Sequence, residues 1–566
     1  MAGLDASIGL SGLLASQRGM DVVGHNIANA STPGFTRQSV ELVSANPTSH
    51  PVGQMGNGVR VAMVRQVADA FLDGRVRVAE GTQGYDHALA QRLGEIEGVL
   101  GDTSEGGLGG LLSGFFSAAD ALGVTPDDPS TRVTFLSSAA RLAEGFQNTA
   151  SFLEASRASV TGEVEGLIDE VNQLATQVAD LNLAILNVEG SGQQANDLRD
   201  QRGVAARRLA RLVGAQTTAQ SSDGALKVTV AGRILVAGTR PRALEVQQDA
   251  AGNARIHFAG VASSLSLDGG EVGGLLAAQQ ETAGLVGQVD RLAQSVIREA
   301  NRIHATGVPG SGPYTTLQTT LGAQDLDLSG DPGDDPLAAA GLGFAPGATT
   351  LTVNVTDPGG ALSTTQIALD PAVDGLNALA AALTALPGLN ASVSPSGLLT
   401  INAAAGFAFD FADRGGGDSD PGGVLAALGA APLFQGSGAF DMAVAAGASP
   451  QALASGLGPG QSDGRNALRF SGIGRAEFAE LEGESAQGFL AVIVSQAGQA
   501  TKVAEDRSQA SARVLEQLEG QREGVSGVSM EEEVANMIRF QRGFEAASRY
   551  LSVLNGLSDE LMRMIG

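Results

Sequence analysis

An acidic stretch in the middle of the chain has the residue types and spacing closest to a metal site. Asp325-Leu326-Asp327-Leu328-Ser329-Gly330 resembles the opening of a calcium-binding loop, with glycine at the sixth position. The twelfth position of such a loop requires a glutamate that binds calcium through both oxygens, and here that position is Pro336. The sequence therefore predicts a solvated acidic loop and no metal site.

The rest of the chain lacks the residue patterns of catalysis. It has no cysteine, which excludes disulfides and thiolate metal sites. It also has no G-x-S-x-G elbow, Walker A loop or dinucleotide fingerprint. The histidines show no pair at helical metal-ligand spacing, and His25, beside Asn26 near a helix end, is expected to pack or cap; the five are His25, His50, His87, His257 and His304. We expect no enzyme, no catalytic residue and no cofactor.

Length and composition indicate a large, acidic, multidomain protein. A chain of 566 residues predicts roughly three to four domains. With 4% aromatic residues and no tryptophan, the cores are expected to be aliphatic and rich in alanine. The net charge of −26 and the absence of a run of Lys or Arg argue against nucleic-acid binding.

The sequence also limits how the protein reaches its destination. The first twenty residues lack a basic region followed by an apolar core, so we expect no cleaved Sec signal peptide. No stretch approaches about 18 consecutive apolar residues, so no membrane insertion is expected. The protein either stays in the cytoplasm or leaves by a route that needs no such signal.

The N-terminus is predicted to be a helix from Leu4 to about Asn29 that the pair Pro33-Gly34 terminates. Its glycines each cost about 1 kcal/mol relative to alanine, but they also permit close helix packing. Two apolar stripes predict contact with more than one neighbour; they are Leu10, Leu13, Met20 and Ile27, and Leu4, Ile8, Ala15 and Val22.

The C-terminus is predicted to be a second helical tract that needs a partner. Ser529-Met530-Glu531-Glu532 fits a capping box, with Ser529 at the N-cap and Glu532 reaching back to it. The following apolar residues form a heptad seam: Ala547, Tyr550, Leu554, Leu557, Leu561 and Met564. Seams at both ends predict that the ends pack together, with each other or with neighbouring copies. We assign the assembly interface to these seams and to Asn29.

Between the ends, helical and extended patterns alternate. A strand is predicted at 59–67 and helices at about 129–159, 164–189, 196–213 and 274–304. The helix at 164–189 has the most regular seam of the chain, from Val164 and Leu167 through Val171 and Leu174 to Val188. Strands are predicted within 225–267, and at 351–355 and 398–402 on either side of a helix at 374–386.

The order of these segments predicts a multidomain α+β protein. Long helices from the N- and C-terminal segments together form an inner rod, and a mostly-β domain is inserted in the middle. We expect a terminal helical domain (1–60 with 520–566), a helical rod domain (61–306 with 449–519) with a strand-rich piece at about 214–270, and an outer domain (307–448).

Both ends resemble the flagellar rod, hook and hook-associated family. Asn26-Ile-Ala-Asn29-Ala-Ser-Thr32-Pro-Gly34-Phe35 is similar to that family's N-terminal signature. The segment from Ser526 to Ala547, with its Ser-Gly-Val-Ser and multi-Glu opening, narrows the resemblance to the hook-associated members. Three internal stretches agree: 197–202, 273–304 and 428–444. Phe544 stands where Tyr is common in the family, and Pro432-Leu433-Phe434 replaces a usual double Phe.

The resemblance implies a structural protein that joins hook to filament and is needed for filament assembly. It implies export in an unfolded state through the flagellar type III apparatus to an extracellular position. The implied partners are other copies in a ring, the hook protein, a second hook–filament junction protein, and an export chaperone that binds the C-terminal tail. A hook or distal-rod protein is the alternative, and an enzyme carried on 307–448 is a third hypothesis that no acid, base and nucleophile set supports.

Overall fold

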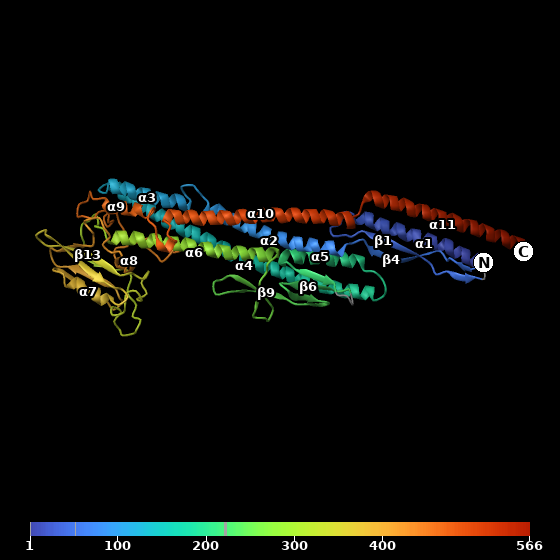
Figure 1. Ribbon diagram of the computed structural model, residues 1–566, viewed down its shortest axis with the longest axis horizontal. Coiled ribbons are helices and arrows are strands. Elements are labelled where there is room, and N and C mark those ends of the chain that lie inside the picture. The colour runs from blue at the N-terminus through green and yellow to red at the C-terminus, as the bar shows by residue number, and fades with distance from the viewer. Residues whose placement is uncertain (1, 51–52, 220–223, 566) are drawn as a thin grey trace. The chain divides into compact units, whose positions relative to one another are not determined.

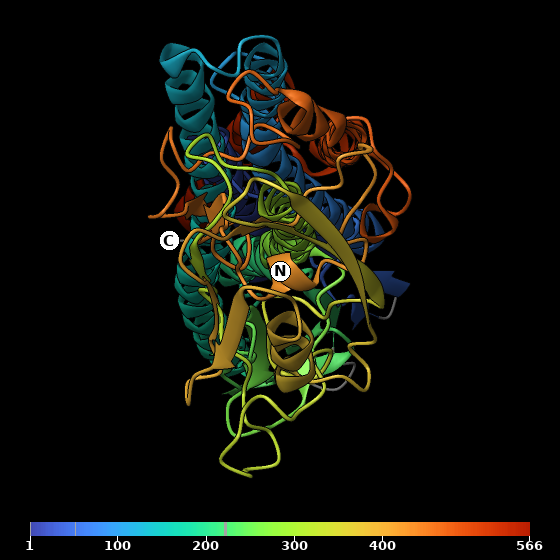
Figure 2. The same ribbon diagram turned by 90° about the vertical axis from the view of Figure 1, so that its left-hand side faces the viewer.

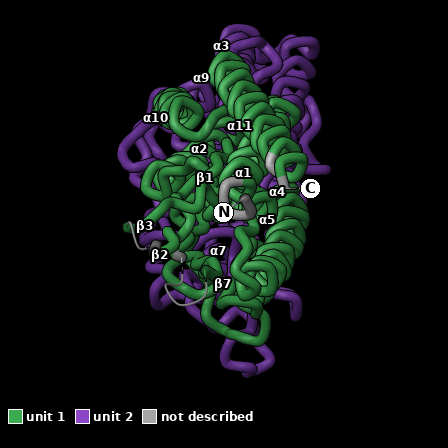
Figure 3. The backbone as a smooth tube through the Cα atoms, turned by 90° about the vertical axis from the view of Figure 1, so that its right-hand side faces the viewer, with its two compact units in different colours: residues 1–92, 158–279, 502–566 green, residues 93–157, 280–501 purple. Residues whose placement is uncertain are grey.

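The computed structural model describes residues 2–50, 53–219 and 224–565, and within these the side chains of residues 2–5, 50, 219, 561 and 565 are not described. The residues group into two compact units (Figure 3). Unit 1 contains residues 1–92, 158–279 and 502–566, and unit 2 contains residues 93–157 and 280–501. Each unit is assembled from segments far apart in the sequence. Among the described helices, none is long and apolar enough to cross a bilayer.

The two ends of the chain pair within unit 1 (Figure 1). Helix α1 (Ala2–Asn29) runs antiparallel to helix α11 (Met530–Ile565). A Cβ atom added at Gly9 would lie 2.8 Å from the Leu551 side chain, and one at Gly19 would lie 2.5 Å from the Phe540 ring. The predicted use of glycine for close helix approach is therefore confirmed at these two positions.

A β-hairpin covers a second side of α1. Strands β1 (Gln38–Ser44) and β4 (Val59–Gln66) pair antiparallel, and the short strands β2 (Thr48–His50) and β3 (Gly53–Met55) pair between them. Ser11 accepts a hydrogen bond from the Val59 backbone at 3.2 Å, which attaches the helix to the hairpin. Ala15 and Val22 of α1 are buried. Strand β4 begins at Val59, beside the domain boundary predicted at residue 60, and that boundary stays a prediction.

The remaining core of unit 1 joins long helices to two small sheets. Helices α4 (Pro129–Glu189) and α5 (Asn196–Val213) pack with the first turns of α6 (Gly270–Ala305) against the sheets. The four-stranded sheet has the order β5-β6-β7-β8, and the three-stranded sheet has the order β11-β10-β9. Their bounds are β5 Gln216–Ala219, β6 Leu226–Val230, β7 Arg233–Ala237, β8 Arg240–Pro241, β9 Leu244–Gln248, β10 Ala254–Phe258 and β11 Ser264–Leu265. Val164, Val171 and Val178 are fully buried in this core, which confirms the predicted seam.

The seam belongs to one continuous helix and not to the second of two. The sequence predicted separate helices before and after about residue 160, whereas α4 runs unbroken from Pro129 to Glu189. No proline interrupts this range, and Leu153 and Val160 are both buried, so the apolar face continues across the predicted break. The predicted start is confirmed, because Asp128 accepts a hydrogen bond from the Ser130 backbone at 3.0 Å.

Unit 2 combines a helical part with the predicted strand-rich segment. Helices α3 (Leu108–Val124) and α9 (Arg465–Gly472) pack together, and the Phe135 ring lies 5.2 Å from Phe115 and 5.4 Å from Phe470. The strands form sheets of order β12-β16-β15, β14-β13-β17 and β18-β19, and the first two of these contribute to a shared, largely aliphatic core. Their bounds are β12 Thr316–Gln318, β13 Thr349–Thr356, β14 Leu362–Leu369, β15 Leu389–Val393, β16 Leu399–Ala403, β17 Ala408–Asp410, β18 Phe434–Gln435 and β19 Ala443–Val444. Short helices α7 (Leu376–Thr384), α8 (Val424–Ala427) and η1 (Ala479–Leu481) complete this unit.

These observations confirm the multidomain α+β class, with long terminal helices and a strand-rich middle. The contacts form two units, and the predicted rod segment 61–306 is shared between them. Three helices contribute residues to both units besides α6: α2 (Ala70–Leu100), α4 and α10 (Ala486–Ser526). The finer division into three domains stays a prediction.

Candidate assembly interface

The segments that carry the sequence signatures meet in unit 1 at one polar junction. Asn26, near the end of α1, is 1% exposed. Its side-chain nitrogen donates to Glu533 Oε2 at 3.0 Å and to the Gln38 carbonyl at 2.9 Å, and its Oδ1 accepts from the Gln38 amide at 3.0 Å. One amide thus joins α1, β1 and α11.

Arg37, which directly precedes β1, joins α11 through charge and the end of α10 through its backbone. Its Nε and a terminal nitrogen each lie 2.8 Å from Glu533 Oε1, and the other terminal nitrogen lies 2.8 Å from Glu532. Its backbone amide donates to the Ser526 carbonyl at 2.9 Å, at the end of α10. Glu533 is 1% exposed, so a desolvated carboxylate is neutralised by a guanidinium and an amide that both come from the N-terminal segment.

The start of α11 is capped as predicted, except for one partner. The Glu532 amide lies 3.5 Å from Ser529 Oγ and the Glu533 amide donates to the Ser529 carbonyl at 2.9 Å. The side chain of Glu532 pairs with Arg37, although the capping box predicted that it would reach back to the N-cap. The charge of Arg37 is the stronger attraction for a carboxylate than a neutral amide.

Two aspartates near the start of α5 also bind the junction through hydrogen bonds. Asp200 accepts from the Thr36 amide at 3.1 Å and from the Gln66 side chain at 2.8 Å, so it holds both ends of the hairpin. Gln38 donates to Asp197 at 2.8 Å. Burial raises the pKa of Asp200 above its usual value, because desolvation disfavours the charged carboxylate.

The Pro-Gly turn of the N-terminal signature packs on the middle of α5. Gly34 has a φ of +84°, and a Cβ there would clash with Val204. Phe35 meets the His25 ring edge-on with centroids 5.4 Å apart, which agrees with the packing role expected of this histidine. A residue with a side chain would be both strained and obstructed at position 34.

The predicted interface residues of α1 lie partly open in this arrangement. Leu10 is 51% exposed, and Ile8, Leu13, Met20 and Ile27 are half-buried. Asn29 is used within the helix end, where it donates to the His25 carbonyl at 3.0 Å and accepts from Thr32 at 3.2 Å. The side chain of Leu4 lies outside the described residues.

The predicted seam of α11 is divided between a covered and an open part. A Cβ added at Gly12 would lie 3.6 Å from Ala547, and Tyr550 adjoins Gly9, so this part of the seam faces α1. Leu554 is half-buried, whereas Leu557 is 57% exposed and Met564 is 71% exposed. The side chain of Leu561 lies outside the described residues. The exposed apolar residues of the last turns of α11 are therefore open to a neighbour.

The site residues that sequence analysis missed are those of the polar junction: Asn26, Arg37, Gln38, Asn196, Asp197, Asp200 and Glu533. Most of them lie inside or beside the segments that resemble the flagellar family. That resemblance was the one sequence feature that could have pointed to them. Polar contacts between residues 507 positions apart, such as Asn26 and Glu533, leave no periodic trace in a sequence. The arrangement fixes the direction of both chain ends against α5 and the hairpin.

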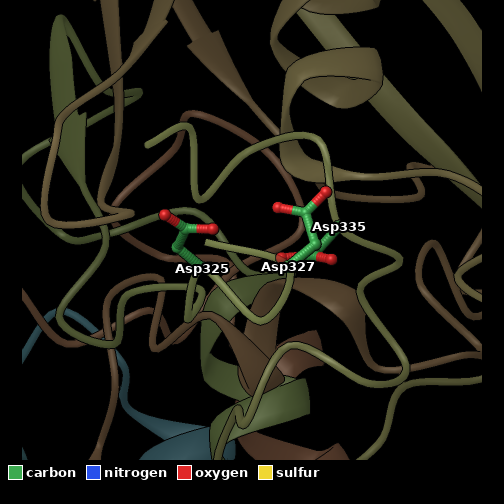
Figure 4. A group of neighbouring side chains, drawn as sticks. All are labelled: Asp325, Asp327 and Asp335. Atoms are coloured by element: carbon green, nitrogen blue, oxygen red, sulfur yellow. The ribbon is translucent and has the colours of Figure 1, made fainter. Parts of the chain in front are cut away.

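The acidic stretch of the middle segment forms a compact loop (Figure 4). Carboxylate oxygens of Asp325, Asp327 and Asp335 lie within 4.8 Å of one another. Backbone amides already use them, since Asp325 accepts from Ser329 at 3.0 Å and Gly330 at 2.8 Å. We therefore retain the prediction that this stretch is a solvated acidic loop.

Comparison with known proteins places this chain among flagellar proteins. The model of the "Flagellar hook-associated protein FlgK helical domain" matches residues 93–318. The models "Flagella basal body rod protein" and "Flagellar basal body rod FlgEFG protein C-terminal" match residues 7–36 and 523–564. Flagellar hook-associated protein 1 of Salmonella typhimurium is 27% identical, over 98% of both chains. The chain is thus similar to flagellar hook-associated protein 1 over nearly its whole length.

Other relatives match this chain to different extents. The Escherichia coli protein is 26% identical over 98% of both chains, and the Bacillus subtilis protein is 30% identical over 40% of this chain and 46% of its own length. A solved structure titled as the flagellar hook junction protein FlgK from Burkholderia pseudomallei has a TM-score of 0.49 and 17% identity, and covers 80% of this chain and 100% of its own. The chain is a flagellar structural component, and the two terminal matches contain Asn26 and Glu533.

Proposed function

We propose that this protein is the junction subunit that joins the flagellar hook to the filament and is needed for filament assembly. The observation that carries the proposal is the junction at Asn26, Arg37 and Glu533, which pairs the two chain ends. That pairing leaves Leu10 of α1 and Leu557 of α11 exposed. Neighbouring subunits would bury these residues in a ring.

The partners of this subunit follow from the same surface. Copies of the chain pack α1 and α11 side by side, with the hook protein on one side of the ring and a second hook–filament junction protein on the other. In this proposal residues 1–60 with 520–566 form the assembling domain, 61–306 with 449–519 the rod domain, and 307–448 the outer domain.

Export precedes assembly, in our proposal, without a cleaved signal peptide and through the flagellar type III apparatus. An export chaperone captures the apolar face of the C-terminal tail, because an amphipathic helix is the kind of segment that a groove-bearing partner recognises. Pull-down of a purified C-terminal peptide, 523–564, from an extract of the same cells tests this step. Equal recovery with Leu554, Leu557 and Leu561 changed to alanine would contradict it.

Electron microscopy of cells that lack the gene tests the proposed function. Hooks without filaments, with flagellin shed into the medium, are the expected result. Cells without hooks would instead favour the alternative, a hook or distal-rod protein. The multi-Glu opening of α11, where Glu532 and Glu533 bind Arg37, favours the hook-associated members over that alternative.

A further inference from the structure

An apolar groove with a basic rim lies between helices α2 and α10 of unit 1, beside strand β5. Its volume is about 850 Å³, and its walls include Phe71, Val78 and Val514, which are 76%, 61% and 51% exposed. Phe71 and Val78 lie on α2 and Val514 lies on α10, so exposed apolar side chains of two helices meet here. Exposed apolar patches of this kind mark interaction sites.

Three arginines line this groove without an ion pair among the described residues. Arg75 and Arg507 are exposed and Arg77 is half-buried. Burial lowers the pKa of Arg77, and the negative charge of Asp73 opposes part of this effect. Asp86 is the acidic residue of the lining and is almost fully buried. In a chain of net charge −26, this rim is a local excess of positive charge that fits an acidic partner.

Helix α4 of the same unit presents the opposite charge. Residues 158–189 contain no lysine or arginine. Three glutamates of this stretch are paired within the unit: Glu163 with Arg92, Glu170 with Arg208, and Glu189 with Arg199. Glu165, Asp169 and Asp180 are exposed and form no ion pair among the described residues.

The three free acids share one face of α4. They stand four and eleven residues apart, which places them on one stripe of an α-helix together with exposed Leu183. A hollow of about 560 Å³ lies on this face, lined by Asp180, Leu181 and Ala184 among others. The face therefore offers a depression beside Asp180, on the same side of the helix as the other two free acids.

We propose that the α2–α10 groove of one subunit binds the acidic α4 face of the next copy, with Phe71 inserted in the hollow beside Ala184. The inference rests on the proposed ring of subunits and names one contact that holds it. Figure 3 places α10 and α4 toward different sides of unit 1, so the two surfaces can be used at once. A contact between two different surfaces repeats head to tail, which is the geometry of a ring or a helical array. An aromatic anchor in a pocket, surrounded by charge pairs, is the usual arrangement of a specific interface.

Charge reversal tests the pairing in a strain that lacks the native gene. Arg75→Glu with Arg507→Glu should abolish filaments, because both sides of the contact become acidic. Adding Asp169→Arg and Asp180→Arg to the same chain should restore filaments, because opposite charges then face each other again. The matched control is Asp120→Arg with Glu144→Arg, two exposed acids of unit 2, which should neither harm the wild type nor rescue the groove variant. Rescue by the control pair, or no rescue by the α4 pair, would overturn the proposal.

Cross-linking tests the contact directly, since the chain has no cysteine of its own. A chain with Phe71→Cys and Ala184→Cys should give a disulfide-linked ladder in isolated, oxidised flagella, and neither single variant should. A dimer from Phe71→Cys alone would mean that grooves face each other, and a product of the wrong mass would mean a different protein. Both results contradict the proposal.

The two proposals fail separately. If the strain without the gene keeps its filaments, the proposed function is wrong. If that strain loses filaments but the Arg75→Glu, Arg507→Glu variant supports them fully, the function holds and the groove contact is wrong.

Discussion

At the scale of single residues, Glu533 holds the chain ends together. It is almost fully buried and accepts from both Asn26 and Arg37. A buried ion pair adds little compared with an apolar substitute, but removing one partner leaves the other charge uncompensated. The residue therefore matters more for the direction of α11 than for total stability.

Glu533→Ala should loosen the pairing of the ends. Breaking a buried pair costs about 3–5 kcal/mol, so hydrogen exchange of residues 26–38 and 530–540 should become faster. Glu531→Ala, an exposed neighbour in the same turn, is the matched control and should leave exchange unchanged. Equal protection in both variants would show that the junction is not what orients α11.

At the scale of helices and strands, close packing of α1 on α11 depends on individual glycines. Gly19 has no room for a side chain against Phe540, whereas Gly24 has no atom within 4 Å of an added Cβ. Glycine thus allows close packing at position 19, whereas at position 24 it only weakens the helix.

Gly19→Ala and Gly24→Ala should therefore have opposite effects. The first forces Phe540 to move and should speed hydrogen exchange in both helices. The second should stabilise α1 by about 1 kcal/mol, because alanine is the better helix former. The same sign for both variants, measured on purified protein, would contradict the close packing of α1 on α11.

The long seam of α4 gives a second test at this scale. Val171→Asp places an unpaired charge at a fully buried position and should unfold the core of unit 1, at a cost of several kcal/mol. Gln177→Asp, on the exposed side of the same helix, should leave the melting temperature within a few degrees. An unchanged melting temperature for Val171→Asp would mean that this stripe is not the core.

Elements were predictable from the sequence where local signals agreed. Helix α5 was predicted at its observed bounds, because Gly214 ends it in the left-handed conformation that favours glycine. The break predicted near residue 160 was wrong. The apolar face of α4 continues through this position, and packing of that face against the rest of the protein keeps the helix continuous. The apolar assembly interface stays a prediction. The partners of Asn26, Arg37 and Asp200 could not be predicted, because they depend on contacts between segments far apart in the chain.

At the scale of the whole molecule, the two units should respond differently to acid. In unit 2, burial lowers the pKa of His304 to about 4, and the ring contacts the Ala431 carbonyl and the Ala454 amide. In unit 1, burial raises the pKa of Glu80 to about 7. Between pH 4 and 6.5 the unfolded chain protonates His304 and the folded one does not, so this residue makes unit 2 less stable as the pH falls. Glu80 acts oppositely in unit 1, whose stability it lowers as the pH rises from about 4.5 to 7.

Lowering the pH from 7 to 4.5 should therefore reduce the hydrogen-exchange protection factors around Ala431 and Ala454, which compare each amide with the unfolded chain at the same pH. His304→Gln cannot take up the proton and should lose this pH dependence, although its protection at pH 7 is lower than that of the wild type. The variant His87→Gln, on helix α2, is the control and should retain the wild-type response. If His304→Gln kept the wild-type pH response, protonation of His304 would not be its cause.

The central claim is that the exposed apolar turns of α11 serve assembly and not folding. Leu554, Leu557 and Leu561 changed together to alanine should leave the circular dichroism of the purified protein close to wild type, because alanine retains the helix and most of this seam lies outside both large cores. The measurement is filament length by electron microscopy in a strain without the native gene that carries this variant. The account predicts hooks without filaments, and filaments of normal length would contradict it.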